Sequence, residues 1–159
     1  MNLLLENNLV FSYGTLKRGF PNHSIMEEIK ASYLVDAITK FKYPLVLAGK
    51  WNTPFLIDNK NYPNSYKVNG ELFEIDKKGI STLDEFEGVG KCYYKRLKID
   101  IYCKTEKGNT ISKDTWCYFR YENSANLLMD SSRFLPFFGK KELKKYTAVH
   151  LRPLDWRNK

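Results

Sequence analysis

Residues 9–23 read LVFSYGTLKRGFPNH, and the interpretation of the whole chain starts from this stretch. Leu9–Tyr13 is nearly all apolar, which predicts a buried first strand. Gly14 lets the chain turn where a β-carbon would clash. The backbone N–H groups of Thr15 and Leu16 can then bind a carboxylate or another anion at the strand end. On residue types alone, a strand–turn–helix connection without a ligand is the more common alternative.

Size and composition favour one β-rich domain. The 159 residues suit a single domain, 1–159, with one core. Hydrophobic residues make up 43% of the chain and charged residues 28%, which is typical of a soluble folded protein rather than a disordered one. Aromatic residues are frequent, at 15%, and many lie in strand-like runs, so the composition predicts a β-rich fold.

The chain is basic, with a formal net charge of +8, which raises the question of a nucleic-acid or membrane partner. The positive residues are spread along the sequence, and the densest run is only Lys140–Lys145. Solvated lysines are the more common explanation of such a bias, so neither partner is expected. A basic nucleic-acid binder stays a competing hypothesis, which salt-dependent retention on DNA or RNA would test.

The cysteines indicate reduced thiols in a cytoplasmic protein, because Cys92, Cys103 and Cys117 are odd in number and form no CxxC pair. Without close ligand pairs, a zinc site with His23 or His150 is not expected. No P-loop, GxSxG or Rossmann signature is present, so neither a metal nor a cofactor is predicted.

No targeting or membrane segment is expected. Met1–Glu6 lacks the basic region and the long apolar run of a signal peptide. No segment approaches the roughly 20 apolar residues that span a bilayer. A monomer is the default expectation.

Alternating or continuous apolar runs predict several strands and few helices. The expected strands are Leu9–Tyr13, Tyr33–Phe41, Tyr43–Gly49, Lys67–Asp76, Tyr93–Cys103 and Thr110–Tyr121, with Trp51–Ile57 as an edge strand or loop. Ser24 and Glu27 fit a capping box for a helix over 24–31, and residues 104–109 predict a hairpin turn. Glu142–Leu151 is compatible with helix or strand. These elements predict an α+β fold, with a mixed, mainly antiparallel β-barrel and short flanking helices.

A second helix carries the acidic cluster DEFE. Asp76 is a good N-cap, Ile80, Leu83 and Phe86 share one apolar face, and the helix should end at Gly88 or Gly90.

Glu87 is the acid of this cluster that should lie nearest the apolar face. It follows Phe86 and comes four residues after Leu83, whereas Glu85 should point outward. Partial burial and the negative end of the helix dipole both raise the pKa of such a carboxylate, which suits a group that exchanges protons near neutral pH. A solvated acidic helix end is the more common alternative.

The motifs together resemble the γ-glutamylcyclotransferase-like (AIG2-like) superfamily, and most of all its γ-glutamylamine cyclotransferase branch. The matching motifs keep their order along the chain: YGTLKRG with PNH (13–23), YPLV with AG (43–49), GE (70–71), LDEFE (83–87), Tyr94 and Arg96. The resemblance is clear over residues 10–96 and weak beyond, apart from an aromatic strand near Trp116–Tyr121. The tail after Asn123 has no clear counterpart.

The resemblance implies a mixed β-barrel flanked by short helices, with a cavity at its mouth. It implies that Tyr13, Gly14, Thr15 and Leu16 bind the carboxylate of a γ-glutamyl substrate, and that Glu87 is the catalytic acid and base. Tyr94 and Tyr118 are lesser candidates for the pocket lining.

The function predicted from the resemblance is that of a γ-glutamylamine cyclotransferase. Such an enzyme releases 5-oxoproline and a free amine from L-γ-glutamyl amides or isopeptides such as γ-glutamyl-ε-lysine. The alternatives are a cyclotransferase for other γ-glutamyl compounds (dipeptides, glutathione or acyl-γ-glutamyl groups) and a non-catalytic module of the same fold that binds a small carboxylate.

Overall fold

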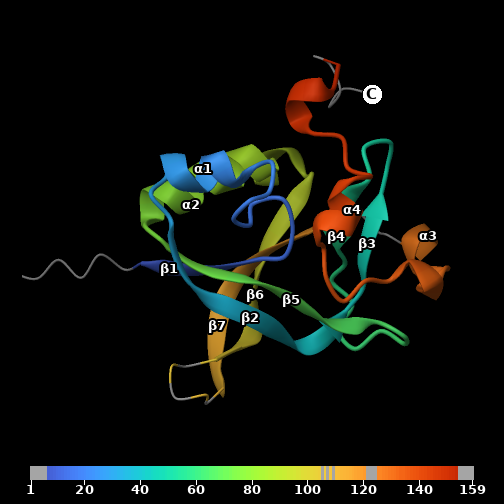
Figure 1. Ribbon diagram of the computed structural model, residues 1–159, viewed down its shortest axis with the longest axis horizontal. Coiled ribbons are helices and arrows are strands. Elements are labelled where there is room, and N and C mark those ends of the chain that lie inside the picture. Colours follow the sequence, from blue (N-terminus) through green and yellow to red (C-terminus); the bar gives the residue numbers. More distant parts are fainter. Residues whose placement is uncertain (1–6, 105, 107, 109, 121–124, 154–159) are drawn as a thin grey trace, which may run out of the picture.

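The computed structural model describes residues 7–104, 106, 108, 110–120 and 125–153. Its centre is a closed five-stranded barrel (Figure 1). The strands follow one another in the order β1 (Asn8–Ser12), β5 (Tyr66–Ile75), β2 (Ser32–Tyr43), β6 (Tyr94–Lys104) and β7 (Thr110–Arg120). Four neighbouring pairs are antiparallel, and the closing pair of β7 with β1 is parallel. The predicted mixed, mainly antiparallel barrel is therefore confirmed.

The short strand β1 lies between β5 and β7 and closes the barrel. Val10 is opposite Trp116 of β7, and Ser12 is opposite Glu71 of β5. Val10, Phe11 and Ser12 are all buried, as the predicted first strand requires. The end of β1 therefore delivers the glycine loop to one rim of the barrel.

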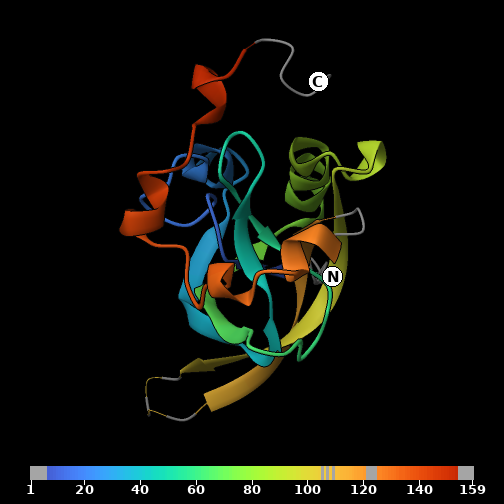
Figure 2. The ribbon, with the colours of Figure 1, turned by 90° about the vertical axis from the view of Figure 1, so that its right-hand side faces the viewer.

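Two helices cover that same end of the barrel (Figures 1 and 2). They are α1 (His23–Glu28) and α2 (Lys77–Glu87), and a 3₁₀ turn, η1 (Val89–Lys91), follows α2. Met26 of α1 and Leu83 of α2 belong to one buried cluster with β1 and β5 residues. A second cluster, which includes Phe11, Leu72, Ile101 and Phe119, forms the core inside the barrel.

Helix α2 begins and ends where the sequence predicts. The side chain of Asp76 accepts a hydrogen bond of 2.6 Å from the N–H of Gly79, which otherwise has no partner within the helix. Gly88 ends the helix with a positive φ of 68°. The cap at each end determines that Glu87 is the last helical residue.

Replacing Asp76 with alanine should lower the free energy of unfolding by about 0.5–2 kcal/mol, because it removes this cap. Urea unfolding monitored by circular dichroism measures the change. Ser81→Ala, an exposed position within the same helix, is the control and should change stability far less. Equal effects of the two substitutions would contradict a capping role for Asp76.

The predicted capping box of α1 is wrong. The helix starts at His23, so Ser24 lies inside it, and the N-cap residue is Asn22, which makes no side-chain cap bond. The amide of Asn22 instead donates to the hydroxyl of Thr15 at 2.8 Å. A tertiary contact with the glycine loop has taken the place of the local cap.

A two-stranded hairpin of β3 (Leu45–Ala48) and β4 (Thr53–Leu56) stands apart from the barrel sheet. The prediction of a short edge strand near Pro54 is confirmed, and Pro54 lies opposite Leu47. Residues 94–104 of β6 pair with residues 110–120 of β7, so the two strands form a hairpin. The turn predicted between them falls largely outside the described residues.

The C-terminal segment runs beside the β3–β4 hairpin and returns toward the helix-covered end of the barrel (Figure 2). Its elements are short: α3 (Ala125–Leu128), η2 (Ser131–Arg133), α4 (Lys140–Leu143) and η3 (Val149–Leu151). The N–H of Leu135 donates to the carbonyl of Leu45, and that of Thr147 to the carbonyl of Trp51. None of the helices in the described ranges has the length and apolar character needed to cross a bilayer.

Candidate active site

A cavity of about 310 Å³ opens at the rim to which β1 delivers its loop. Six parts of the chain supply its wall: the end of β1 with the following loop, the end of α2, the start of β6, the end of β7, the β3–β4 hairpin and the C-terminal segment. The lining residues are 11–16, Asn22, Trp51, 53–55, Phe86, Glu87, 92–94, Tyr118, Arg120, Tyr146, Val149 and Arg152. All four predicted loop residues and Glu87 are in this set.

Tyr13 anchors the start of the loop to strand β7. Its side chain is buried, and its hydroxyl donates a hydrogen bond of 2.7 Å to the backbone carbonyl of Tyr118. Gly14 follows immediately and lies against the hairpin, since a β-carbon there would come within 3.1 Å of Cγ of Pro54. The absence of a side chain at Gly14 therefore avoids a tight contact with β4, in the sense of the expected clash.

The loop presents backbone donors that the described part of the protein leaves unused. Its turn is closed by the N–H of Lys17, which donates to the carbonyl of Gly14, and by the N–H of Asn22, which donates to that of Thr15. Within the described residues, the N–H groups of Gly14, Thr15 and Leu16 make no hydrogen bond. Three successive donors beside a cavity have the character of an anion-binding site.

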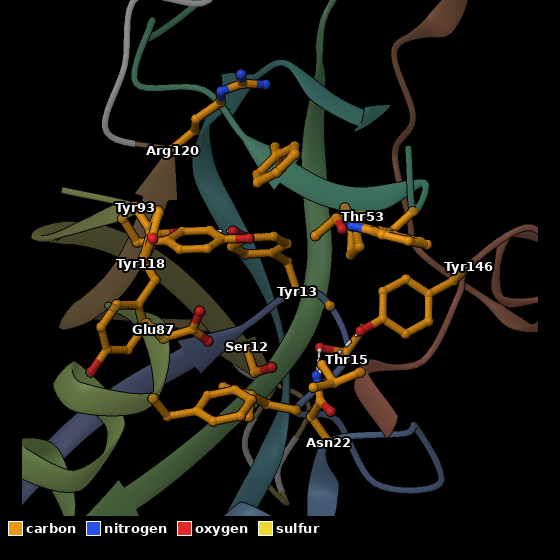
Figure 3. A pocket seen from close by; sticks show the side chains of 18 of the residues that line it. Ser12, Tyr13, Thr15, Asn22, Thr53, Glu87, Tyr93, Tyr118, Arg120 and Tyr146 are labelled. Atoms are coloured by element: carbon orange, nitrogen blue, oxygen red, sulfur yellow. Dashed lines mark hydrogen bonds between the residues drawn. The ribbon is translucent and has the colours of Figure 1, made fainter. Parts of the chain in front are cut away.

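Glu87 lies across from this loop, at the C-terminal end of α2. Figure 3 shows its carboxylate turned inward, between Tyr118 and Ser12. Glu85, two residues earlier, is exposed and does not line the cavity. The helical spacing thus correctly predicts which of the two glutamates faces inward.

The carboxylate of Glu87 shares the cavity with the buried phenol of Tyr118 and the partly buried phenol of Tyr94. Desolvation raises the pKa of Tyr94 well above its usual value, and the charge of Glu87 raises it further. Desolvation likewise dominates the raised pKa of Tyr118. Both tyrosines therefore stay protonated at neutral pH and act only as hydrogen-bonding or packing groups in the wall.

Asp84 is held away from the cavity by two partners. It accepts hydrogen bonds of 2.8 and 3.1 Å from the guanidinium of Arg96, and one of 2.8 Å from the hydroxyl of Tyr118. These bonds tie α2 to β6 and β7, one helical turn before Glu87. They fix the rotation of the helix, and with it the direction in which Glu87 points.

Comparison with known proteins gives the same assignment as the motifs. The sequence model described as "Gamma-glutamyl cyclotransferase, AIG2-like" matches residues 10–135. The chain belongs to this family. A Danio rerio relative, gamma-glutamylaminecyclotransferase C, is 42% identical over 111 residues, which are 66% of this chain and 68% of the relative.

Two further members extend the comparison. An Arabidopsis thaliana relative is 46% identical over 98 residues, 58% of this chain and 50% of its own length, so the match spans about half to two thirds of these two relatives. The crystal structure of an AIG2-like protein from Mus musculus superposes with a TM-score of 0.76 at 27% identity. It covers 92% of this chain and 99% of the mouse protein.

In this family member, a buried lysine ties the loop to the C-terminal segment. Lys17 is 2% exposed and donates a hydrogen bond of 2.5 Å to the carbonyl of Phe138. Its ammonium group also lies 4.4 and 4.3 Å from the ring centroids of Phe20 and Phe137. Burial is the largest influence and lowers the pKa of Lys17 to about 8.

The free energy of unfolding should therefore depend on pH through Lys17. The folded protein releases the lysine proton near pH 8, whereas the unfolded chain keeps it up to the ordinary pKa of 10.5. The stability of the unmodified protein relative to Lys17→Met should rise as the pH increases from about 8 toward 10.5. Urea titrations of both proteins at several pH values measure this difference in the free energy of unfolding. A difference that stays constant or falls as the pH increases would contradict the burial of the charge.

The outer wall of the cavity is the part that sequence reasoning missed. Figure 3 shows Thr53, Arg120 and Tyr146 around the cavity, and Val149 and Arg152 complete this side. Asn22, which also lines the cavity, belonged to a quoted motif but carried no role there. The five outer-wall residues come from the hairpin, the end of β7 and the tail without a counterpart, and no sequence pattern gave any of them a role in the site.

The described residues contain no group of three or more His, Cys, Asp or Glu side chains placed to hold a metal ion. Cys103 and Cys117 are buried thiols, and Cys92 is exposed at the cavity.

Proposed function

We propose that the protein is a γ-glutamyl cyclotransferase that releases 5-oxoproline and a free amine from L-γ-glutamyl amides or isopeptides. One observation carries the proposal: a single cavity holds both the loop Tyr13–Leu16, with three N–H groups that no described residue accepts from, and the carboxylate of Glu87. Membership in the family supports it, as does the name of the Danio rerio relative, gamma-glutamylaminecyclotransferase C. The γ-glutamyl amines named there are the preferred substrate class.

The loop binds the α-carboxylate of the glutamyl group. Its N–H groups donate to the carboxylate oxygens, while the hydrogen bonds from the N–H groups of Lys17 and Asn22 to the carbonyls of Gly14 and Thr15 hold the shape of the loop. The glutamyl chain is thereby held bent, with its α-amine near its own γ-carbonyl. Orientation of this kind is worth roughly 7–11 kcal/mol in intramolecular reactions.

Glu87 then moves one proton. Its carboxylate takes a proton from the α-amine, and the amine nitrogen attacks the γ-carbonyl carbon to close a five-membered ring. As the bond from that carbon to the leaving nitrogen breaks, protonated Glu87 returns the proton to the leaving amine. The products are 5-oxoproline and a free amine, and no water is consumed. The loop N–H groups also stabilise the oxyanion that develops on the carbonyl.

Incubating the protein with γ-glutamyl-ε-lysine, a γ-glutamyl dipeptide and glutathione tests this function. Mass spectrometry of the mixtures should show 5-oxoproline and the matching free amine in equal amounts from at least one compound. Tight binding of these compounds without 5-oxoproline would instead identify a non-catalytic carboxylate-binding module. Absence of both binding and turnover would overturn the proposal altogether.

A further inference from the structure

Glu71 of the GE motif is a buried acid that lies next to the glycine loop but outside the lining of the cavity. It is 8% exposed. One of its carboxylate oxygens, Oε2, accepts a hydrogen bond of 3.1 Å from Nε of Arg18 and a longer one of 3.4 Å from the backbone N–H of the same residue. A charge with so little access to water needs such partners, so the contact with Arg18 is part of what lets the fold hold this acid.

The backbone of Glu71 holds the entry of the loop. Glu71 is paired with Ser12, the last residue of β1, in the antiparallel ladder between β1 and β5. Tyr13 follows Ser12 directly and begins the loop. Strand pairing therefore fixes the position of the loop entry relative to Glu71, and that position cannot change without breaking the sheet.

The side chain of Glu71 holds the exit of the loop. Arg18 follows Lys17, whose N–H closes the turn by donating to the carbonyl of Gly14 at 3.2 Å. The carboxylate accepts from the backbone N–H of Arg18 as well as from its side chain, so it holds the main chain and not only a long side chain. A single residue of β5 thus sets the distance between the two ends of the loop.

Packing orients Arg18 for this contact. Its guanidinium carbon lies 3.3 Å from the ring centroid of Tyr33, whose hydroxyl donates to Asp36 at 3.0 Å. Asp36 also lies 3.8 Å from a guanidinium nitrogen of Arg18, but its side chain is 79% exposed. Because an exposed ion pair of this length contributes little, the buried carboxylate of Glu71 is the stronger partner of Arg18.

From this arrangement, which rests on the proposed function, we infer that Glu71 is a positioning residue for binding of the glutamyl α-carboxylate. Together with Arg18, it keeps the three successive N–H groups of the loop aligned with the bound carboxylate. Glu71 acts through the main chain of the loop and not by contact with the substrate. Since the three donors belong to one stretch of backbone, a loop that shifts at its exit loses the alignment of all three at once.

Glu71→Gln removes the charge and keeps the shape of the side chain. We expect it to lower kcat/KM for 5-oxoproline release by about 10- to 100-fold, measured with the γ-glutamyl compound that the unmodified protein cleaves fastest. The change should appear mainly in KM, because the α-carboxylate keeps its charge throughout the reaction. A merely structural role would instead lower the folded fraction, and with it the apparent kcat, and leave KM unchanged.

Asp36→Asn is the matched control. It removes the exposed acid beside the same arginine and leaves the buried contact intact, so both KM and kcat should stay near normal.

A double-mutant cycle tests whether Glu71 acts through Arg18. Arg18→Gln should raise KM by a similar factor, and the variant that carries both substitutions should be no worse than either alone, because each breaks the same contact. Arg18→Lys should keep part of the affinity, since the charge and the backbone N–H remain while the planar fork is lost. The side chain of Arg18 is half exposed, so its variants remain usable if Glu71→Gln folds poorly.

Binding measured without turnover gives a second readout. In the Glu87→Gln background, isothermal titration calorimetry with the same γ-glutamyl compound yields Kd directly. Adding Glu71→Gln should weaken Kd by about the factor seen in KM, and adding Asp36→Asn should leave Kd unchanged.

The outcomes separate the positioning role from the proposed function. Normal KM and Kd in Glu71→Gln, or fully additive effects of the two substitutions, would overturn the role and leave the cyclotransferase proposal standing. Binding of γ-glutamyl compounds without 5-oxoproline release would overturn the function, and the Kd of Glu71→Gln would still decide the role. Absence of both binding and turnover in the unmodified protein would overturn both.

Discussion

Replacing Glu87 with glutamine is expected to lower kcat for 5-oxoproline release by about 10²–10⁴-fold, the usual contribution of an acid–base group. Glutamine has nearly the same shape and keeps the contacts of the α2 end, but it cannot take up a proton from the α-amine. The substrate should still bind, since the loop Tyr13–Leu16 is untouched. KM should therefore change much less than kcat.

Glu85→Gln is the matched control for this variant. Glu85 lies on the same helix two residues earlier, is exposed, and does not line the cavity. It should show near-normal kcat, and both variants should melt close to the unmodified protein. Near-normal release of 5-oxoproline by Glu87→Gln would show that another group handles the proton and would end the mechanism proposed here.

Gly70→Ala is expected to have the largest effect on folding. Gly70 lies in β5 beside the end of β1, and a β-carbon there would come within 2.3 Å of the backbone carbonyl oxygen of Ser12 and 2.7 Å of the Phe11 ring. Side chains can rotate away from such a contact, but a backbone atom of a paired strand cannot move without breaking the pairing. Overpacking typically lowers the free energy of unfolding by about 1–3 kcal/mol. At this chain length, each kcal/mol lowers the melting temperature by about 2–4 °C.

The same substitution should also impair the site, because Ser12 directly precedes the glycine loop. We expect a higher KM for γ-glutamyl substrates even at temperatures where the variant is folded. Gly90→Ala is the control, since a β-carbon at Gly90 has open space around it. Thermal unfolding and steady-state kinetics of both variants measure these effects. A Gly70→Ala protein as stable as Gly90→Ala would contradict the close approach of β1 and β5.

Several elements of the fold could be predicted because their signals are local. The first strand follows from an apolar run that ends at Gly14, and α2 follows from Asp76, a helical apolar face and Gly88. The inward direction of Glu87 follows from its spacing after Leu83. Each of these depends on sterics or periodicity within one short segment.

Local reasoning failed where a tertiary contact competed with a local one. Ser24 and Glu27 fit a capping box, yet α1 begins at His23, and the amide of Asn22 binds Thr15 instead. The role of Asp84 was equally invisible, because its partners Arg96 and Tyr118 come from two other strands. Nothing within five residues of Asp84 indicates that it holds the helix rather than faces the cavity.

The sequence by itself determined the strand that ends in the glycine loop, the helix that ends in Glu87, and the motif order that marks the family. The resemblance implied that these two ends act on one substrate, but the tertiary structure alone showed the cavity that joins them and placed Arg120 and Arg152 in its wall. Short-range steric effects and helical periodicity depend only on residues that are close in the sequence. The meeting of segments more than thirty residues apart depends on how the barrel closes and where the C-terminal segment packs, and no local pattern records that.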